Sequence, residues 1–177
     1  MPERIGLWPA IFHEIRYVMR PNHFLKEFPV PESTSFRFHD RLQDYWEKLK
    51  GDRPFPSESD IDPEELPDIW PSCFLVAIDD VTRRMGYRFS YLGEDLIEAY
   101  GDDVTNPDLA LRLISQANTS MVKKFDEVIR TGKPVIAASE FVNLKRLKIR
   151  YRTCLLPLGA QDGTISYIIG CMRWKIY

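Results

Sequence analysis

The fold is decided where the chain reads CFLVAIDDVTRRMGYRFSYLG, at residues 73–93. Residues 73–78 form a continuous apolar run, which is typical of a buried strand. Residues 87–91 alternate between aromatic and polar side chains, as in a strand with one covered face. The stretch therefore predicts two strands, joined by a polar turn around residues 82–84.

The chain that follows this stretch predicts helices first and then three more strands. Apolar side chains recur at helical spacing in residues 93–100 and again in residues 106–131, which we expect to form one long helix. Strand patterns return at residues 135–144, 147–155 and 164–174. Because hairpins at the two ends enclose the helices, the order predicts an α+β domain, with a five-stranded antiparallel sheet and helices on one face.

The first part of the chain predicts a separate helical extension. An apolar stripe at helical spacing lies within residues 8–20, and residues 22–35, with Pro29 and Pro31, indicate a linker. The residues of the stripe are Trp8, Ile11, Phe12, Ile15 and Met19. We therefore expect an N-terminal amphipathic helix and linker at 1–35 and a domain at 36–177, which begins with a second amphipathic helix.

The stripe of the first helix needs a cover, because an isolated helix gains little from an exposed apolar face. The sequence allows two ways to cover this stripe. The helix can dock on the exposed face of the sheet, or it can pair with the same helix of a second chain in a homodimer.

The order of strands and helices matches that of PAS domains, and several segments carry a family resemblance. Among them are Asp60-Ile61-Asp62-Pro63 with the aromatic helix before it, Tyr87-Arg88-Phe89-Ser90-Tyr91-Leu92-Gly93, Thr131-Gly132-Lys133-Pro134 and Leu155-Leu156-Pro157-Leu158. Over roughly residues 36–175 the chain resembles a family of single-domain PAS proteins that is common in alphaproteobacteria. The resemblance implies a cytoplasmic regulator of the cell cycle, motility or signalling.

Charge and composition limit the classes of binding partner and the compartments that suit the chain. The 177 residues carry a net charge of −2, so no global positive field attracts nucleic acid, and we regard nucleic acid as a disfavoured partner. The longest apolar runs are too short to span a bilayer, and the start lacks a signal-peptide pattern. The three cysteines, Cys73, Cys154 and Cys171, are widely spaced, which favours a reduced, cytoplasmic setting and a place in the core over a redox or metal cluster.

The sequence disfavours two cofactor chemistries and assigns no cofactor. His13, His23 and His39 all precede the first strand, so a histidine-ligated haem in the usual PAS position is disfavoured. No cysteine lies between Cys73 and Cys154, where a covalent flavin adduct would need one. A histidine-based catalytic triad within the core is excluded because no histidine lies between residues 40 and 177, and we expect no enzyme.

Two groups of residues are candidates for binding. A small-molecule cavity under the long helix would be lined by Tyr87, Phe89, Tyr91, Met121, Phe125 and Tyr151, although plain core packing is the favoured interpretation. A basic stretch could bind an anionic ligand, a nucleotide or RNA; its residues are Lys145, Arg146, Lys148, Arg150 and Arg152. For this stretch a solvated sheet face, with cross-strand partners such as Glu140, is favoured.

The sequence thus predicts a PAS-type sensory or regulatory module that acts through a small ligand and through protein–protein contacts, without catalysis. A homodimer or a signalling protein is the expected partner, and no membrane span is expected. The alternatives are a small-molecule lyase or isomerase with a cone-shaped α+β fold and a ligand-free structural adaptor.

Overall fold

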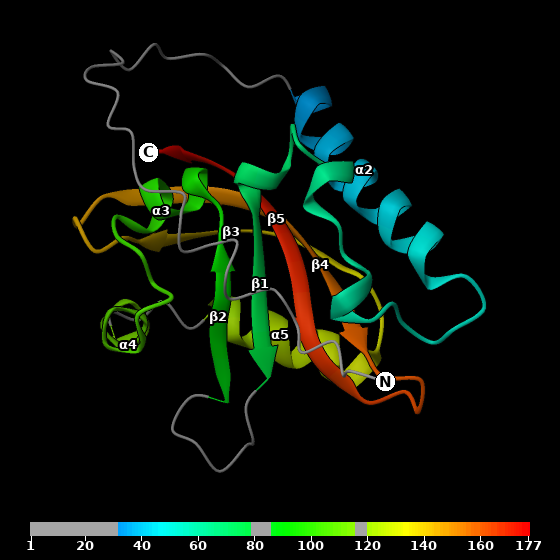
Figure 1. Ribbon diagram of the computed structural model, residues 1–177. Coiled ribbons are helices and arrows are strands. Elements are labelled where there is room, and N and C mark those ends of the chain that lie inside the picture. The colour runs from blue at the N-terminus through cyan, green and yellow to red at the C-terminus, as the bar shows by residue number, and fades with distance from the viewer. Residues whose placement is uncertain (1–31, 79–85, 116–119) are drawn as a thin grey trace.

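The computed structural model describes residues 32–78, 86–115 and 120–177, and its centre is one five-stranded antiparallel sheet (Figure 1). The strands are β1 (Cys73–Ile78), β2 (Tyr87–Leu92), β3 (Val135–Val142), β4 (Lys148–Gly159) and β5 (Ile165–Ile176). Their order across the sheet is β2-β1-β5-β4-β3. The predicted α+β fold with a five-stranded antiparallel sheet is therefore confirmed, and β1 and β5 meet in its middle.

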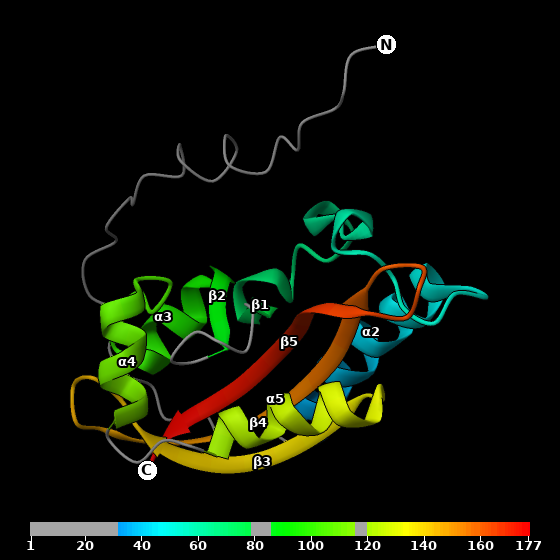
Figure 2. The ribbon, with the colours of Figure 1, turned by 90° about the horizontal axis from the view of Figure 1, so that it is seen from below.

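Three helices cover the face of the sheet that we call the inner face. They are α3 (Glu94–Tyr100), α4 (Pro107–Ser115) and α5 (Ser120–Thr131). The prediction of one long helix from residue 106 onward is wrong, because α4 and α5 run in different directions (Figures 1 and 2). Asn106 still starts α4 as expected, since its side chain accepts a hydrogen bond from the Asp108 amide at 3.0 Å.

The opposite face of the sheet, which we call the outer face, is also covered by helices. The sequence analysis expected this face to be exposed. Helix α2 (Glu32–Lys50) lies there with three short 3₁₀ turns, η1 (Glu58–Asp60), η2 (Pro63–Glu65) and η3 (Trp70–Ser72). The Trp46 indole donates a hydrogen bond to the Pro157 carbonyl at 2.7 Å, which ties α2 to β4. Figures 1 and 2 show α2 and α5 on opposite sides of β4 and β5. Much of the face that was expected to be exposed is therefore buried.

The acidic stretch of the η turns is paired with α2 by charge. Lys48 contacts Glu65 at 2.8 Å, and Arg41 forms an ion pair with Asp68. Asp60 pairs with Arg53, which follows α2, at 2.8 Å. Asp62 caps η2, because its carboxylate accepts a hydrogen bond from the Glu64 amide. The acidic run thus anchors the η turns to the helix.

Helix α2 begins earlier than expected. It starts at Glu32, so its first four residues lie in the segment 22–35 that was predicted to be a linker. The start follows Pro31, and prolines are common just before or within the first turn of a helix. The predicted helix at 8–20, with Trp8, Ile11, Phe12, Ile15 and Met19, lies outside the described residues. Among those described, no helix is long and apolar enough to cross a bilayer.

Candidate functional site

Seven aromatic rings form a connected group on the inner face, between the sheet and the helices. We call this group the aromatic chain, and its members are Phe74, Tyr87, Phe89, Tyr100, Phe125, Phe141 and Tyr151. Neighbouring ring centroids are 5.1 to 6.4 Å apart, within the range of favourable edge-to-face and tilted contacts. The chain of rings leads from β2 past α5 to β3 and β4.

Tyr100 occupies the middle of the aromatic chain because the end of α3 is fixed there. Gly101 ends the helix in the left-handed conformation, with φ of +88°, which a glycine adopts without strain. The Leu144 amide donates to the Tyr100 carbonyl at 2.9 Å, and the buried Asn143 side chain donates to the Ala99 carbonyl at 3.1 Å. The turn between β3 and β4 therefore holds the Tyr100 backbone in place.

The Tyr100 hydroxyl is buried, yet it finds no hydrogen-bond partner among the residues that the structure describes. The side chain is 3% exposed and its ring lies between those of Phe89 and Phe141. Burial raises the pKa of Tyr100, and the nearby Tyr151 hydroxyl raises it further, so the phenol stays neutral. A neutral phenol is a hydrogen-bond donor, and this donor is buried in the inner core.

Two further hydroxyl groups, those of Tyr151 and Ser120, lie on the same face. The Tyr151 hydroxyl and the Ser120 hydroxyl are 3.5 Å apart, at the limit of a hydrogen bond. Ser120 is the first residue of α5, and Tyr151 lies on β4. The interior between sheet and α5 therefore offers polar groups as well as rings.

The structure brings five of the six predicted cavity residues together on the inner face. Those in or against the inner core are Tyr87, Phe89, Met121, Phe125 and Tyr151. The sequence analysis missed Tyr100 and Phe141 as members of this group. The helical spacing before Gly101 and the strand pattern after residue 135 indicated that both side chains were buried, but they gave no sign that their rings meet.

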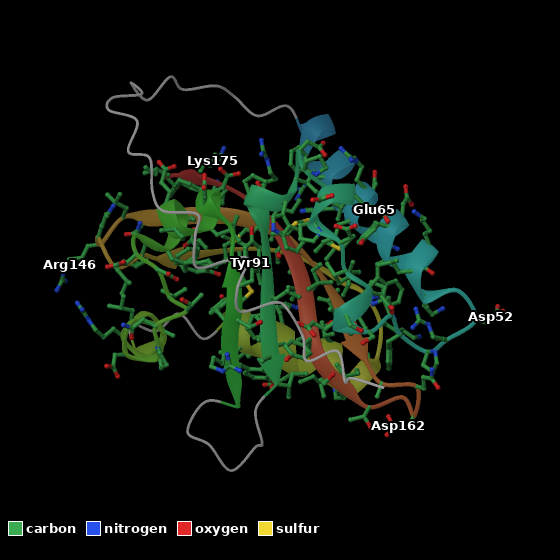
Figure 3. All side chains as sticks on the ribbon, in the orientation of Figure 1. Asp52, Glu65, Tyr91, Arg146, Asp162 and Lys175 are labelled. Atoms are coloured by element: carbon green, nitrogen blue, oxygen red, sulfur yellow. The ribbon has the colours of Figure 1, made fainter. Side chains whose placement is uncertain are left out.

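Tyr91 is the exception, and its assignment to the cavity is wrong. The pairing of β1 with β2 shifts between Leu75 and Val76, because Ser90 is an extra residue that forms a β-bulge. The bulge turns Tyr91, which is labelled in Figure 3, to the outer face. There its ring stacks on that of Trp70, with 4.8 Å between the ring centroids. Alternation along β2 alone had placed all three aromatic side chains on one face.

Comparison with known proteins identifies the family. The family model described as "PAS domain" matches residues 35–173, which is most of the chain. The chain belongs to the PAS domain family. This PAS domain thus has a fold that is found in sensory modules, and the family is generally non-catalytic.

Solved structures also resemble this PAS domain, at low identity. A LOV protein from Rhodobacter sphaeroides is 10% identical, with 64% of this chain and 68% of that chain covered and a TM-score of 0.43. The N-terminal domain of a diguanylate cyclase with a PAS/PAC sensor from Marinobacter aquaeolei is 16% identical, with coverages of 57% and 93% and a TM-score of 0.42. No curated protein matches the chain. No functional statement follows from likenesses at this level.

The three cysteines form a row across the outer face of the PAS sheet. Cys171 on β5 lies opposite Cys73 on β1 and opposite Cys154 on β4, so the three cysteines occupy three adjacent strands. All three are free and buried, and burial raises the pKa of Cys154 to about 12. Within the described ranges no group of His, Cys, Asp and Glu has the arrangement of a metal site. The row packs as core beneath α2.

The basic stretch begins in the turn between β3 and β4, with Lys145 and Arg146, and continues along β4. Lys148, Arg150 and Arg152 share the outer face of β4, as the sequence alternation predicted. The expected cross-strand partner is present, since Arg150 approaches Glu140 on β3 at 4.0 Å. Both side chains are about half exposed, so this pair contributes little to stability.

Proposed function

We propose that this PAS domain is a sensory module that binds a small ligand on its inner face and passes the occupancy on through protein contacts. The ligand would lie between the sheet and α5, against the aromatic chain. The side chains proposed to contact the ligand all lie in or against the inner core, and they are Tyr87, Phe89, Tyr100, Met121, Phe125 and Tyr151.

The observation that carries the proposal is the Tyr100 hydroxyl. A buried polar group without a partner costs about 1–3 kcal/mol, so native proteins rarely leave one. Among the described residues this hydroxyl has no partner, although its backbone is held on both sides. A ligand that accepts its hydrogen bond would remove that cost.

The surroundings define the chemistry of the ligand. Because burial keeps the phenol protonated, the ligand must present an acceptor, such as a carbonyl oxygen or an unprotonated ring nitrogen, to Tyr100. The rings of Phe89 and Phe141 on either side favour an apolar or flat aromatic body. PAS domains commonly bind ligands or signalling partners, which agrees with this proposal.

A route for the signal starts at the same residue. Tyr100 ends α3, and its carbonyl accepts the Leu144 hydrogen bond from the turn between β3 and β4. Asn143 in this turn also accepts from the amides of Lys145 and Leu147, at 3.0 and 2.9 Å. A change at the Tyr100 ring would therefore reach the turn that leads into β4.

Native mass spectrometry of the freshly purified full chain tests the proposal. We expect a non-peptide mass that stays bound under native conditions and is lost under denaturing conditions. The same aromatic rings also pack on one another, which supports the rival proposal of a ligand-free adaptor. That rival predicts no bound mass, even after incubation with a protein-free metabolite extract.

The protein contact remains a proposal from the sequence. The apolar stripe of the predicted helix at 8–20 would pair with its copy in a homodimer, because much of the outer sheet face is already covered by α2. Light scattering of the full chain should then give the dimer mass. The double variant Ile11→Glu/Ile15→Glu should give the monomer, whereas a wild-type monomer would exclude this output.

A further inference from the structure

Two free cysteines lie directly opposite each other in the two central strands of the sheet, Cys73 on β1 and Cys171 on β5. Opposite residues of paired strands project to the same face, and both thiols lie in the outer core, where neither residue is more than 1% exposed. Cys154 on β4 lies opposite Cys171 on its other side. Cys171 therefore has two thiol neighbours, of which it can bond to only one at a time.

The backbone hydrogen bonds make the two cysteine pairs different. The Cys73 carbonyl accepts a hydrogen bond from the Gly93 amide at 2.9 Å, so the backbone groups of Cys73 point to β2 and away from β5. The Cys171 carbonyl accepts from the Thr153 hydroxyl at 2.9 Å, so it points to β4. Cys73 and Cys171 are therefore a non-hydrogen-bonded pair, whereas Cys171 and Cys154 are a hydrogen-bonded pair.

This difference decides which pair is suited to a disulfide. Opposite Cα atoms are about 4.5 Å apart in a non-hydrogen-bonded pair and about 5.5 Å apart in a hydrogen-bonded pair, and the side chains of the former are closer. A disulfide requires two Cβ atoms only about 3.5–4.5 Å apart. The pair of Cys73 and Cys171 meets this requirement better than the pair of Cys171 and Cys154.

The two thiols can lose their hydrogens without leaving a buried carbonyl unpaired. The Cys73 thiol donates to the Ile69 carbonyl at 3.3 Å, but that carbonyl also accepts from the Ser72 amide at 2.9 Å. The Cys171 thiol donates weakly to the Phe38 carbonyl at 3.9 Å, and this carbonyl lies within α2, where it accepts a bond from the next turn. Oxidation of the pair therefore costs little hydrogen bonding.

The cover on the outer face controls access to the pair. Burial raises the pKa of both the Cys73 and the Cys171 thiol, and a protonated thiol is a poor nucleophile. Helix α2 lies over Cys171, and its ion pairs with the η turns, such as that of Lys48 with Glu65, are exposed and contribute little to stability. Local opening of α2 would admit water and a small oxidant to the thiols.

We propose that Cys73 and Cys171 form a reversible disulfide when a hydroperoxide reaches the opened outer core. The Cys171 thiolate attacks one oxygen of hydrogen peroxide, which breaks the O–O bond, gives a sulfenic acid and releases the other oxygen as water. The Cys73 thiolate then attacks the sulfenic sulfur, which forms the S–S bond and releases a second water. In sum, two thiols lose two electrons and two protons, and one peroxide is reduced to two waters.

The disulfide would lock the middle of the sheet. Strand β1 pairs with β2, and β5 pairs with β4, so a bond between β1 and β5 joins the two halves of the sheet covalently (Figure 1). Residues 73 and 171 enclose most of the domain, and a cross-link that closes a long loop restricts the unfolded chain most. We expect the midpoint of urea denaturation to rise by roughly 1 M or more on oxidation.

The test treats the full chain with hydrogen peroxide, denatures it in iodoacetamide and maps its peptides by mass spectrometry without reduction. We expect a cross-link between Cys73 and Cys171 that dithiothreitol removes. The matched variants are Cys154→Ser, which should form the cross-link as the wild type does, and Cys73→Ser, which should form at least tenfold less disulfide. A cross-link mainly between Cys171 and Cys154, or oxidation without an intramolecular disulfide, would overturn the proposal.

Two further measurements test how the disulfide forms and what it does. Trp46→Phe removes the hydrogen bond to Pro157 that ties α2 to β4, so it should speed disulfide formation several-fold, and an unchanged rate would overturn the gating by α2. Urea denaturation of oxidised and reduced wild type needs no variant, and equal midpoints would overturn the lock. Tyr100→Phe should oxidise at the wild-type rate, because the pair does not depend on a ligand at the inner face.

Discussion

The Tyr87 hydroxyl donates a hydrogen bond to the Asp126 carboxylate, and this contact joins the edge strand β2 to helix α5. Removing it in Tyr87→Phe should lower the free energy of unfolding by about 1 kcal/mol, because a partly exposed hydrogen bond contributes about that much. Amide exchange should become faster in α5, since the helix loses its tie to β2. Urea denaturation and hydrogen exchange measure the two effects.

Tyr91→Phe is the matched control for this variant. Tyr91 lies on the same strand, but its hydroxyl donates to the Trp70 carbonyl on the outer face, at 3.3 Å. We expect a similar loss of stability without faster exchange in α5. Equal exchange rates in α5 for both variants would show that the Tyr87 contact does not hold this helix.

Gly170 on β5 makes room for the Phe74 ring. A Cβ atom at this position would lie 2.4 Å from the ring of Phe74, which is fully buried. Gly170→Ala should therefore lower the free energy of unfolding by about 1–3 kcal/mol, the usual cost of overpacking a core. Adding Phe74→Leu should recover part of the loss, and two losses that simply add in urea denaturation would contradict this account.

His39 on α2 should make stability depend on pH. Its imidazole is buried, and neither nitrogen finds a hydrogen-bond partner among the described residues. Burial lowers the pKa of His39 below the usual 6.5, and the charges of Arg152 and Arg173 lower it further, against contacts with the Arg152 backbone and Asp40 that raise it. The unfolded chain thus binds a proton more readily than the folded one.

Because His39 binds a proton more tightly in the unfolded chain than in the folded one, the free energy of unfolding should fall as the pH drops from about 7 to 5. The fall should be smaller in His39→Leu, which leaves the other titrating groups unchanged. One of these is Glu58, whose pKa is raised by burial and which acts in the opposite sense. Urea denaturation at both pH values decides: an equal fall in wild type and variant would exclude His39 as the cause.

Local patterns were sufficient to predict most of the fold. The alternation along β4 assigned Ile149 and Tyr151 to one face and Arg150 to the other, and the structure confirms it. The helix ends were equally visible, since Asn106 caps α4 and Gly101 ends α3. These features depend on neighbours within a few residues, which the sequence displays directly.

The features that sequence patterns missed depend on contacts between distant segments. The bulge at Ser90 is set by the pairing of β1 with β2, so the change of face at Tyr91 leaves no trace in the alternation. The lack of a partner for the Tyr100 hydroxyl, likewise, is a property of the packed interior. The opposed pair Arg152 and Arg173 arises from the register of β4 and β5. Candidate binding residues therefore required the structure.

The central claim is that a small ligand accepts a hydrogen bond from Tyr100 on the inner face. Native mass spectrometry of wild type, Tyr100→Phe and Tyr167→Phe, purified in parallel, tests it most directly, because Tyr167 lies against the outer core. The account predicts the same bound mass in wild type and Tyr167→Phe, and a lower occupancy in Tyr100→Phe, because its affinity should fall about tenfold on losing about 1.4 kcal/mol of binding. Equal occupancy in all three proteins, or no bound mass in any, would contradict it.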